Sequence, residues 1–115
     1  MFFKFSEYSY VIKPGTTDMR CGDEALANIV ESEMKMNPLS KTMFLFCNRN
    51  RTIIKVLVWD GNGFWLMCKR LRSRTFCWPG NVPECMNITL DDLRRLLQGQ
   101  NVFRKLEVLD NKKWM

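Results

Sequence analysis

Basic side chains gather in the middle third of this chain, and they are the residues best suited to bind a ligand by charge. Between Phe44 and Trp78 there are seven of them and a single acid, Asp60, so this segment carries the entire net charge of +6. A positive charge concentrated in this way attracts polyanions such as nucleic acid. The alternative is a solvated surface that only keeps the protein soluble. The seven residues are Arg49, Arg51, Lys55, Lys69, Arg70, Arg72 and Arg74.

The residue types offer little for catalysis. Histidine is absent, which excludes histidine-dependent triads, zinc-protease motifs and Cys₂His₂ fingers. Asp18, Asp60 and Glu84 are acids of the kind that hold metal ions in nucleases, but nothing in the sequence places them together. Asp60 also suits the first position of a tight turn. We therefore expect a protein that is not an enzyme, with no catalytic residues, no metal site and no cofactor.

The cysteines and the apolar runs point to a cellular compartment. No pair of cysteines has the Cys-x-x-Cys spacing of structural zinc sites. The first residues lack a basic segment followed by a long apolar run, and no stretch reaches the roughly 18 apolar residues of a membrane span. We expect buried, reduced thiols in a cytoplasmic protein that does not contact membranes. The cysteines are Cys21, Cys47, Cys68, Cys77 and Cys85.

The elements that must position these residues form an α+β pattern. Strand-like runs occur at residues 8–13, 43–47, 52–60 and 64–71, with a shorter one at 75–78. They predict an antiparallel β-meander of about four to five strands with two helices packed on it. One domain spans residues 1–115, with a core at about 8–99 and an extension at 100–115 that could form a final strand or turn.

The start of the first predicted helix breaks two local rules. Residues 16–18 offer capping side chains, which puts Arg20 within or beside the first turn, where a cation opposes the helix dipole. Gly22 costs about 1 kcal/mol there relative to alanine. An anion held by Arg20 and the free N–H groups would relieve both problems. A salt bridge from Arg20 to Asp18 or Glu24 is an equally good explanation. The second helix, by contrast, begins regularly at Thr89 with a capping-box spacing and ends at Gly99.

The predicted hairpins place the charge in space. Alternate tips of a meander lie at the same end of the sheet, so we expect residues 49–51 beside residues 72–74, and Asp60 at the opposite end. A two-residue turn at Asn62-Gly63 would make Lys55 and Arg70 cross-strand partners. Of the two alternating faces, the one with Ile54, Val56 and Val58 is the more apolar and should face the helices. The other face takes Lys55, Leu57, Trp59, Leu66, Cys68 and Arg70.

Three aromatic residues flank the acidic tip: Trp59, Phe64 and Trp65. Aromatic side chains around a rigid turn make good interface anchors because their burial costs little side-chain entropy. We therefore consider this tip a contact for a protein partner, either another protein or a second copy. The alternative is that all three close this protein's own core.

Several segments resemble one bacterial transposon family. Residues 14–22 are similar to its G-x-TDMR-x-G opening, and residues 46–57 to its F-x-N-R-x-R-x-x-IK-x-L stretch. Residues 59–66, which read WDGNGFWL, closely match its most specific segment, and residues 76–79 and 89–99 complete the likeness. The family is TnpB, the accessory protein encoded by the second reading frame of insertion-sequence elements of type sixty-six. Cys21 departs from the family, which usually has a lysine or another polar residue there, and an aromatic residue often found near Cys68 is missing.

The resemblance implies a small protein that works with a second accessory protein and a separate transposase to move the element. Together with the charge, it leads us to expect a non-catalytic protein that binds DNA, at transposon ends or target, mostly through phosphates. The alternative is a protein–protein adaptor for the transposase without direct DNA binding; a homodimer is also compatible with the sequence. The candidate DNA contacts are Arg20, Arg49, Arg51, Lys55, Lys69, Arg70, Arg72 and Arg74.

Overall fold

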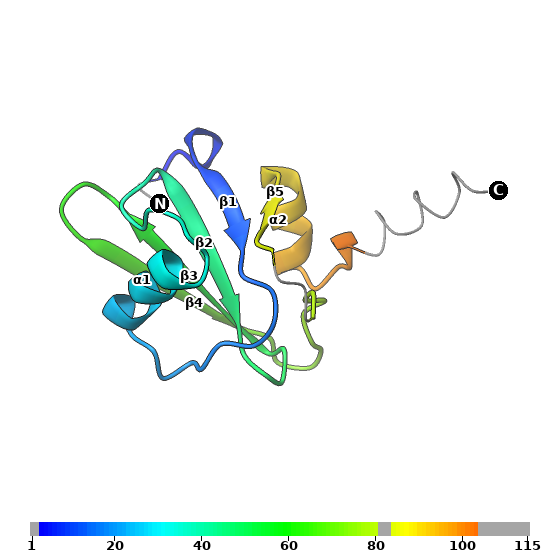
Figure 1. Cartoon of the computed structure of the whole chain (residues 1–115). Coiled ribbons are helices and arrows are strands. Elements are labelled where there is room, and N and C mark those ends of the chain that lie inside the picture. The colour runs from blue at the N-terminus through cyan, green and yellow to red at the C-terminus, as the bar shows by residue number, and fades with distance from the viewer. Residues whose placement is uncertain (1–2, 81–83, 104–115) are drawn as a thin grey trace.

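A five-stranded sheet with the strand order β4-β3-β2-β1-β5 forms the centre of the protein (Figure 1). The computed structural model describes residues 3–80 and 84–103. The sheet is mostly antiparallel and two helices pack on it, which confirms the α+β class. The strands are β1 (Ser9–Ile12), β2 (Thr42–Cys47), β3 (Ile53–Trp59), β4 (Phe64–Arg70) and β5 (Met86–Ile88). The helices are α1 (Asp23–Ser32) and α2 (Leu90–Leu97), and a 3₁₀ turn, η1 (Phe5–Glu7), precedes β1.

The meander is confirmed for three strands and wrong for the pair β1–β2. Strands β2, β3 and β4 are joined by two hairpins and pair antiparallel. Strand β1 instead runs parallel to β2, with Tyr10 beside Met43 and Ile12 beside Leu45. The physical reason is the connection: α1 lies between these two strands in sequence, and a helical crossover returns the chain in the same direction.

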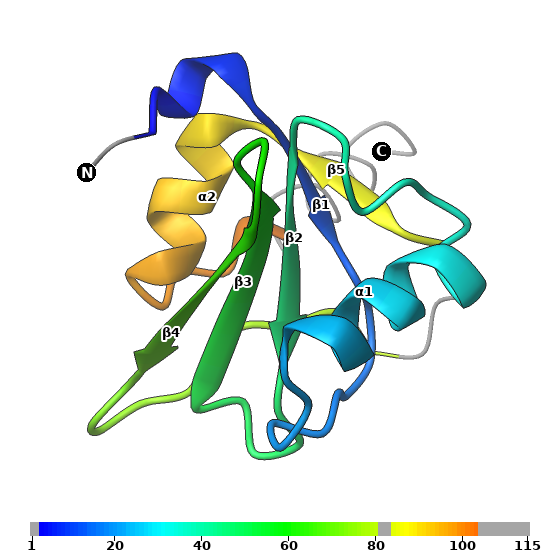
Figure 2. The same cartoon turned by 90° about the vertical axis from the view of Figure 1, so that its left-hand side faces the viewer.

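The two helices cover opposite faces of the sheet, so the expectation that one apolar face receives both helices is wrong. Helix α1 packs on Phe44, Phe46 and Leu57. Helix α2 packs on the other face, against Ile54 and Val58. Figure 2 shows α1 in front of the strands and α2 behind them. Strand β2 is buried along its whole length because it is covered on both sides.

The predicted register of the β3–β4 hairpin is wrong by two residues. The turn takes all four residues from Asp60 to Gly63, so Trp59 lies opposite Phe64 and Lys55 lies opposite Cys68. Arg70 lies opposite Ile53, and the expected Lys55–Arg70 pair does not form. A shift of two preserves the side-chain alternation, so the division of residues between the two faces stands.

Two short segments near the end of the sheet also differ from expectation. Residues 75–78 do not form a strand, although Phe76 and Trp78 are buried and the Trp78 indole N–H donates to the Lys13 carbonyl at 3.0 Å. The fifth strand is β5, which pairs antiparallel with β1 at the other edge. The residues after Phe103, part of the predicted extension, lie outside the described residues.

The second helix begins as predicted and the first does not. The Thr89 side chain accepts from the Asp92 N–H at 3.0 Å, and the Asp92 carboxylate accepts from the Thr89 N–H at 3.3 Å, which completes a capping box. Helix α1 starts only at Asp23, with Gly22 at its N-cap. Arg20 therefore precedes the helix and does not lie in its first turn.

Candidate nucleic-acid interface

The turn between β2 and β3 is held by one asparagine side chain. The Asn48 carbonyl oxygen accepts from the N–H groups of Thr52 and Ile53 at 2.8 and 3.0 Å, and its amide donates to the Thr52 hydroxyl at 3.0 Å. Arg51 adopts a left-handed conformation with φ of 59°, which tightens the turn. These side-chain bonds fix the conformation of the turn. Arg49 and Arg51, which the turn carries, are both exposed.

The segment that follows β4 lies beside this tip, as the meander predicts. The Leu71 N–H donates to the Thr52 carbonyl at 2.8 Å, and the Phe76 N–H donates to the Arg51 carbonyl at 2.6 Å. The burial of Phe76 holds the far end of the segment. Arg72 and Arg74 lie between these two attachment points.

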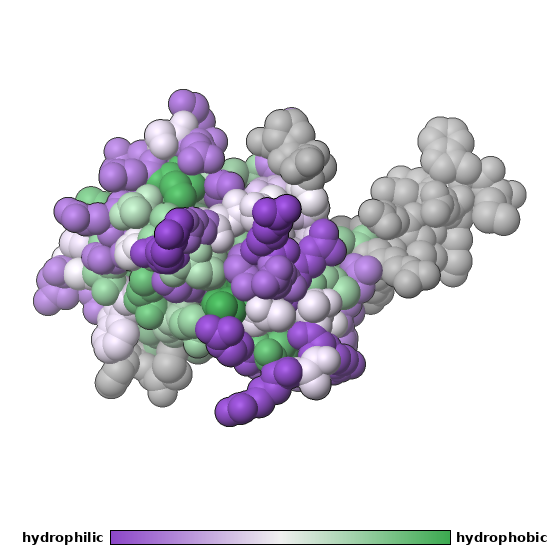
Figure 3. All heavy atoms as spheres, turned by 90° about the horizontal axis from the view of Figure 1, so that it is seen from below, coloured by the Kyte–Doolittle hydropathy of each residue, from purple (hydrophilic) through white to green (hydrophobic). Residues whose placement is uncertain are grey.

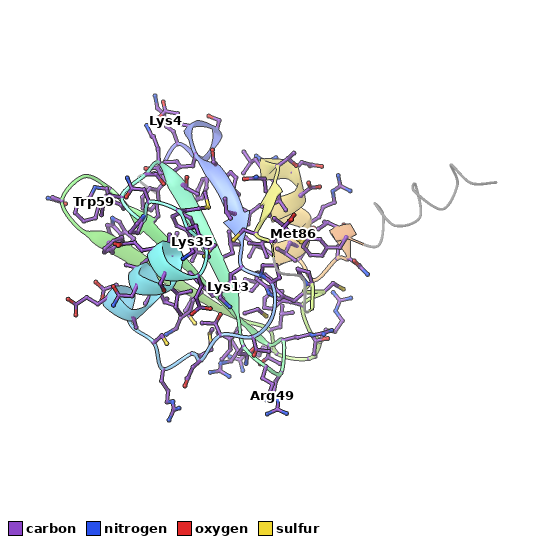
Figure 4. All side chains as sticks on the ribbon, viewed as in Figure 1. Lys4, Lys13, Lys35, Arg49, Trp59 and Met86 are labelled. Atoms are coloured by element: carbon purple, nitrogen blue, oxygen red, sulfur yellow. The ribbon has the colours of Figure 1, made fainter. Side chains whose placement is uncertain are left out.

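We call Arg49, Arg51, Arg72 and Arg74 the basic end. All four are exposed, and none forms a salt bridge with a carboxylate of residues 3–80 or 84–103. Arg49 extends from the molecule at the end opposite the β3–β4 turn (Figure 4). Seen from that side, groups of hydrophilic side chains project from a surface that also exposes hydrophobic areas (Figure 3). Four arginines without a salt bridge on two adjoining segments create a positive field that can hold several phosphates. The Arg74 guanidinium reaches toward Gly99, at the end of α2, so the field extends to that side of the basic end.

The ammonium group of Lys55 is hydrogen-bonded within the protein, which the sequence does not reveal. Its ammonium donates to the carbonyls of Met19 and Cys21 at 2.6 and 3.1 Å. The side chain is half-buried between β3 and the segment that leads into α1. Lys55 therefore holds this segment against the sheet, and it lies apart from the exposed arginines of the basic end.

Arg20 forms a salt bridge with Asp18, one of the two roles considered for it from the sequence; the other was binding of an anion. Its guanidinium contacts the Asp18 carboxylate at 2.7 Å, and its backbone N–H donates to the same carboxylate at 2.9 Å. Side-chain and backbone hydrogen bonds from Arg20 lower the pKa of Asp18 to about 2. The pair is exposed, with 91% of the Arg20 side chain accessible, and the Asp18 carboxylate beside it offsets the formal charge that Arg20 brings.

Lys69 and Arg70 end β4 and are both exposed. Successive residues of a strand point to opposite faces, so Lys69 lies on the α2 face and Arg70 on the α1 face. They border the basic end without sharing one surface. The eight predicted contacts thus divide into four exposed arginines on two adjoining segments, two neighbours on β4, one ion-paired arginine and one lysine that holds a loop.

An open depression of about 390 Å³ separates the β2–β3 turn from residues 16–19. Arg49 and Asn50 line one side, and Thr16 and Asp18 line the other. Thr17 is only 7% exposed, and its hydroxyl has no hydrogen-bond partner among the described residues. The sequence alone does not single out Asn50 or the threonines as site residues, because only the tertiary structure brings the segments that carry the TDMR and NRNR letters together.

The aromatic residues of the acidic tip divide between the two faces. Trp59 and Phe64 pack edge to face, with ring centroids 5.1 Å apart, and both are half-buried. Trp65 lies on the other face, 42% exposed, with its ring 5.9 Å from that of Phe3. Its indole N–H donates to Asp60 at 2.6 Å, and this bond lowers the pKa of that carboxyl. Asp60 opens the turn as predicted, since its N–H donates to the Gly63 carbonyl at 3.0 Å.

The acids and thiols show no assembled reactive centre in the described part of the chain. Within residues 3–80 and 84–103, no three of the cysteines and acids lie close enough together to hold a metal ion. All five cysteines are free, but only Cys47 is buried, and burial raises the pKa of its thiol to about 11. The expectation of buried thiols is wrong for Cys68, which is exposed on the edge strand β4. In the same residues, no helix is long and apolar enough to cross a membrane.

Comparison with known proteins agrees with the sequence motifs. The profile of TnpB_IS66, described as IS66 Orf2 like protein, matches residues 8–107. The match defines an accessory protein family of transposition. The chain belongs to the family of IS66 Orf2-like proteins. It is 40% identical over 88 residues to the uncharacterized protein y4hO of Sinorhizobium fredii, covering 76% of each chain. No solved structure matches the chain.

Proposed function

We propose that this protein assists transposition by binding DNA through the phosphates that meet its basic end. The observation that carries the proposal is the group of four exposed arginines on two segments that are hydrogen-bonded to each other, Leu71 to Thr52 and Phe76 to Arg51. Arginine suits this role because its planar guanidinium binds phosphate oxygens in pairs. Neither described helix presents a row of base-reading side chains at this end, so we expect little sequence preference.

The experiment compares duplex binding by three proteins at 50 mM salt: wild type, R49A/R51A/R72A/R74A, and the control K4A/K35A/K41A/R94A. The control removes the same formal charge from exposed positions away from the basic end. We expect the first variant to lose at least 100-fold in affinity and the control to lose less than fivefold. Equal losses would mean that net charge, and not this surface, attracts DNA.

A second candidate is an adaptor that binds the transposase without contacting DNA. The exposed ring of Trp65 favours it, because large aromatic side chains anchor protein interfaces. In this case the wild-type protein would bind transposase but no duplex, and W65A would lose the transposase while remaining folded.

The proposal also makes the protein non-catalytic. Purified protein should neither nick nor join supercoiled plasmid in the presence of Mg²⁺ or Mn²⁺. Reproducible nicking that disappears in D18N or D60N would overturn this part of the proposal.

A further inference from the structure

An apolar groove opens between the sheet and α2 at the free edge of β4. Its volume is about 140 Å³. Phe5, Met67, Leu93 and Leu97 contribute apolar walls, and it reaches inward to residues of β2 and β3. Cys68 also borders the groove although its side chain belongs to the opposite face, so the groove extends to the edge of the strand.

The same edge carries unpaired backbone groups. The Asp60–Gly63 and Leu71–Thr52 hydrogen bonds fix which residue pairs of the β3–β4 ladder are bonded. By the alternation of an antiparallel ladder, the N–H and C=O groups of Phe64, Leu66, Cys68 and Arg70 point away from β3. In the described part of the chain, β4 ends the sheet and no backbone group from elsewhere pairs with these four residues.

We propose that β4 and α2 form a binding site for an extended peptide segment of a partner protein, with a large apolar residue flanked by carboxylates. The peptide adds a sixth strand to the sheet along β4, and its apolar side chain enters the groove. A cavity of about 150 Å³ accepts a benzene ring, so this groove has room for one leucine, methionine or phenylalanine side chain. Residues on either side of the apolar one point to the opposite face of the sheet, where Arg70 at the end of β4 favours carboxylates.

The arrangement favours an isolated segment over a second copy of the chain. Helix α2 runs alongside β4 (Figure 2), and its residues Leu93 and Leu97 form the groove wall. A copy paired through its own β4 would bring a second α2 to the same side of the joint. An extended peptide carries no such helix and leaves the groove open to its side chain.

The test uses three synthetic peptides of the form acetyl-EVEXEVE-amide, in which X is leucine, methionine or phenylalanine. Binding to the full-length protein is followed by amide chemical shifts and by fluorescence polarisation, without DNA. We expect shifts along β4 and α2, and a loss of tenfold or more when X is serine. Methylation of the peptide amides that face β4 should abolish binding, whereas methylation of the alternate amides should not.

Two protein variants probe the same bonds from the other side. C68P removes an outward N–H at a position where an edge strand tolerates proline, and C68A keeps that N–H as the matched control. We expect C68P to lose binding tenfold or more and C68A to keep it. If C68P does not fold, the methylated peptides still test the backbone pairing with β4, because they are used with the wild-type protein.

The proposal is overturned if none of the three peptides binds below 1 mM, or if both methylation patterns have the same effect. It is also overturned if the shifts fall at Arg49 and Arg51, which would mean that the acidic peptides bind the basic end by charge alone. Self-association through β4, or occupation of the groove by the chain's own residues 104–115, would replace the partner peptide by another occupant. A failure of DNA binding leaves all of these measurements unaffected.

Discussion

Replacement of Lys55 by methionine tests the distinction between a cation that binds a ligand and one that holds a loop. The ammonium of Lys55 donates to the Met19 and Cys21 carbonyls at 2.6 and 3.1 Å. Methionine keeps the apolar length of the side chain and removes both donors. The carbonyls belong to the segment that joins β1 to α1, so their loss loosens the attachment of that segment to the sheet.

The expected cost follows from the two bonds. A hydrogen bond to a charged group contributes about 1.5–3 kcal/mol, and a carbonyl near the surface recovers part of this from water. We therefore expect K55M to lower the free energy of unfolding by about 2 kcal/mol. With a urea m-value in the range of about 1–3 kcal/mol/M, the unfolding midpoint should fall by about 1 M.

The measurement is urea unfolding followed by circular dichroism, with K69M as the matched control. Lys69 is an exposed lysine on the neighbouring strand, so K69M should change stability by less than about 0.5 kcal/mol. At low denaturant, K55M should bind duplex DNA within twofold of wild type. The reasoning is refuted if K55M is as stable as K69M, or if it loses DNA affinity at unchanged stability.

Three further predictions concern other parts of the molecule. Log affinity for duplex DNA should fall with log salt at a slope of about −3.6 for four phosphate contacts, which is a loss of about 150-fold between 50 and 200 mM salt. Replacement of each arginine of the basic end by alanine should reduce the magnitude of this slope by about 0.9. A slope that stays unchanged when all four are replaced contradicts the site. T89A should destabilise the protein by about 1 kcal/mol in thermal melting because it breaks the capping box of α2, whereas T89S should melt like wild type. The pKa of Asp18, followed by carboxyl chemical shifts, should be about 2 and should return toward 3.8 in R20A. Since folding lowers this pKa, the ion pair stabilises the folded state above pH 3.8, and this stabilisation is lost as the pH falls toward 2. An unchanged pKa in R20A would disprove the pairing.

The hairpins could be predicted because their signals are local. Turn residues and alternating runs identify β2, β3 and β4, and the order of the tips then brings the β2–β3 turn beside residues 72–74. The register failed because Asn62-Gly63 favours a two-residue turn, while the structure uses Asp60 as well, whose side chain accepts from the Asn62 N–H at 3.3 Å. A turn sequence indicates a hairpin more reliably than it counts the residues in the loop.

The placement of the helices could have been inferred from β2. Residues Thr42–Cys47 are buried without interruption, and a continuous apolar run of this kind is typical of a strand covered on both faces. Strand β5 gave no comparable signal, since it has three residues and exists through its pairing with Tyr10, Val11 and Ile12. Such a strand is set by its partner and not by its own sequence.

The sequence predicts which segments carry the exposed arginines of the candidate site, but not which contacts its other charged residues make. Spacing along strands placed the arginines of the basic end together, because that requires only the order of the hairpins. Spacing does not show that Lys55 meets carbonyls more than 30 residues earlier in the chain, nor that Arg20 is neutralised by Asp18. Exposed charges can thus be located from topology, whereas their partners require the tertiary structure.

Strand β4 connects the two proposed binding surfaces, and this connection has a measurable consequence. Its last residues, Lys69 and Arg70, border the basic end, and Lys69 also lines the peptide groove. A bound duplex places negative charge near this end of β4, so an acidic peptide should bind the DNA complex more weakly, by threefold to tenfold at 50 mM salt and by less than twofold at 500 mM. Peptides in which glutamine replaces every glutamate should show no such loss, because they keep the strand pairing and the apolar residue but not the charge. The peptide should weaken DNA binding by the same factor, since coupling between two ligands is reciprocal. An equal loss for the glutamine peptides would mean that DNA covers the β4 edge itself, and the two surfaces would then be one.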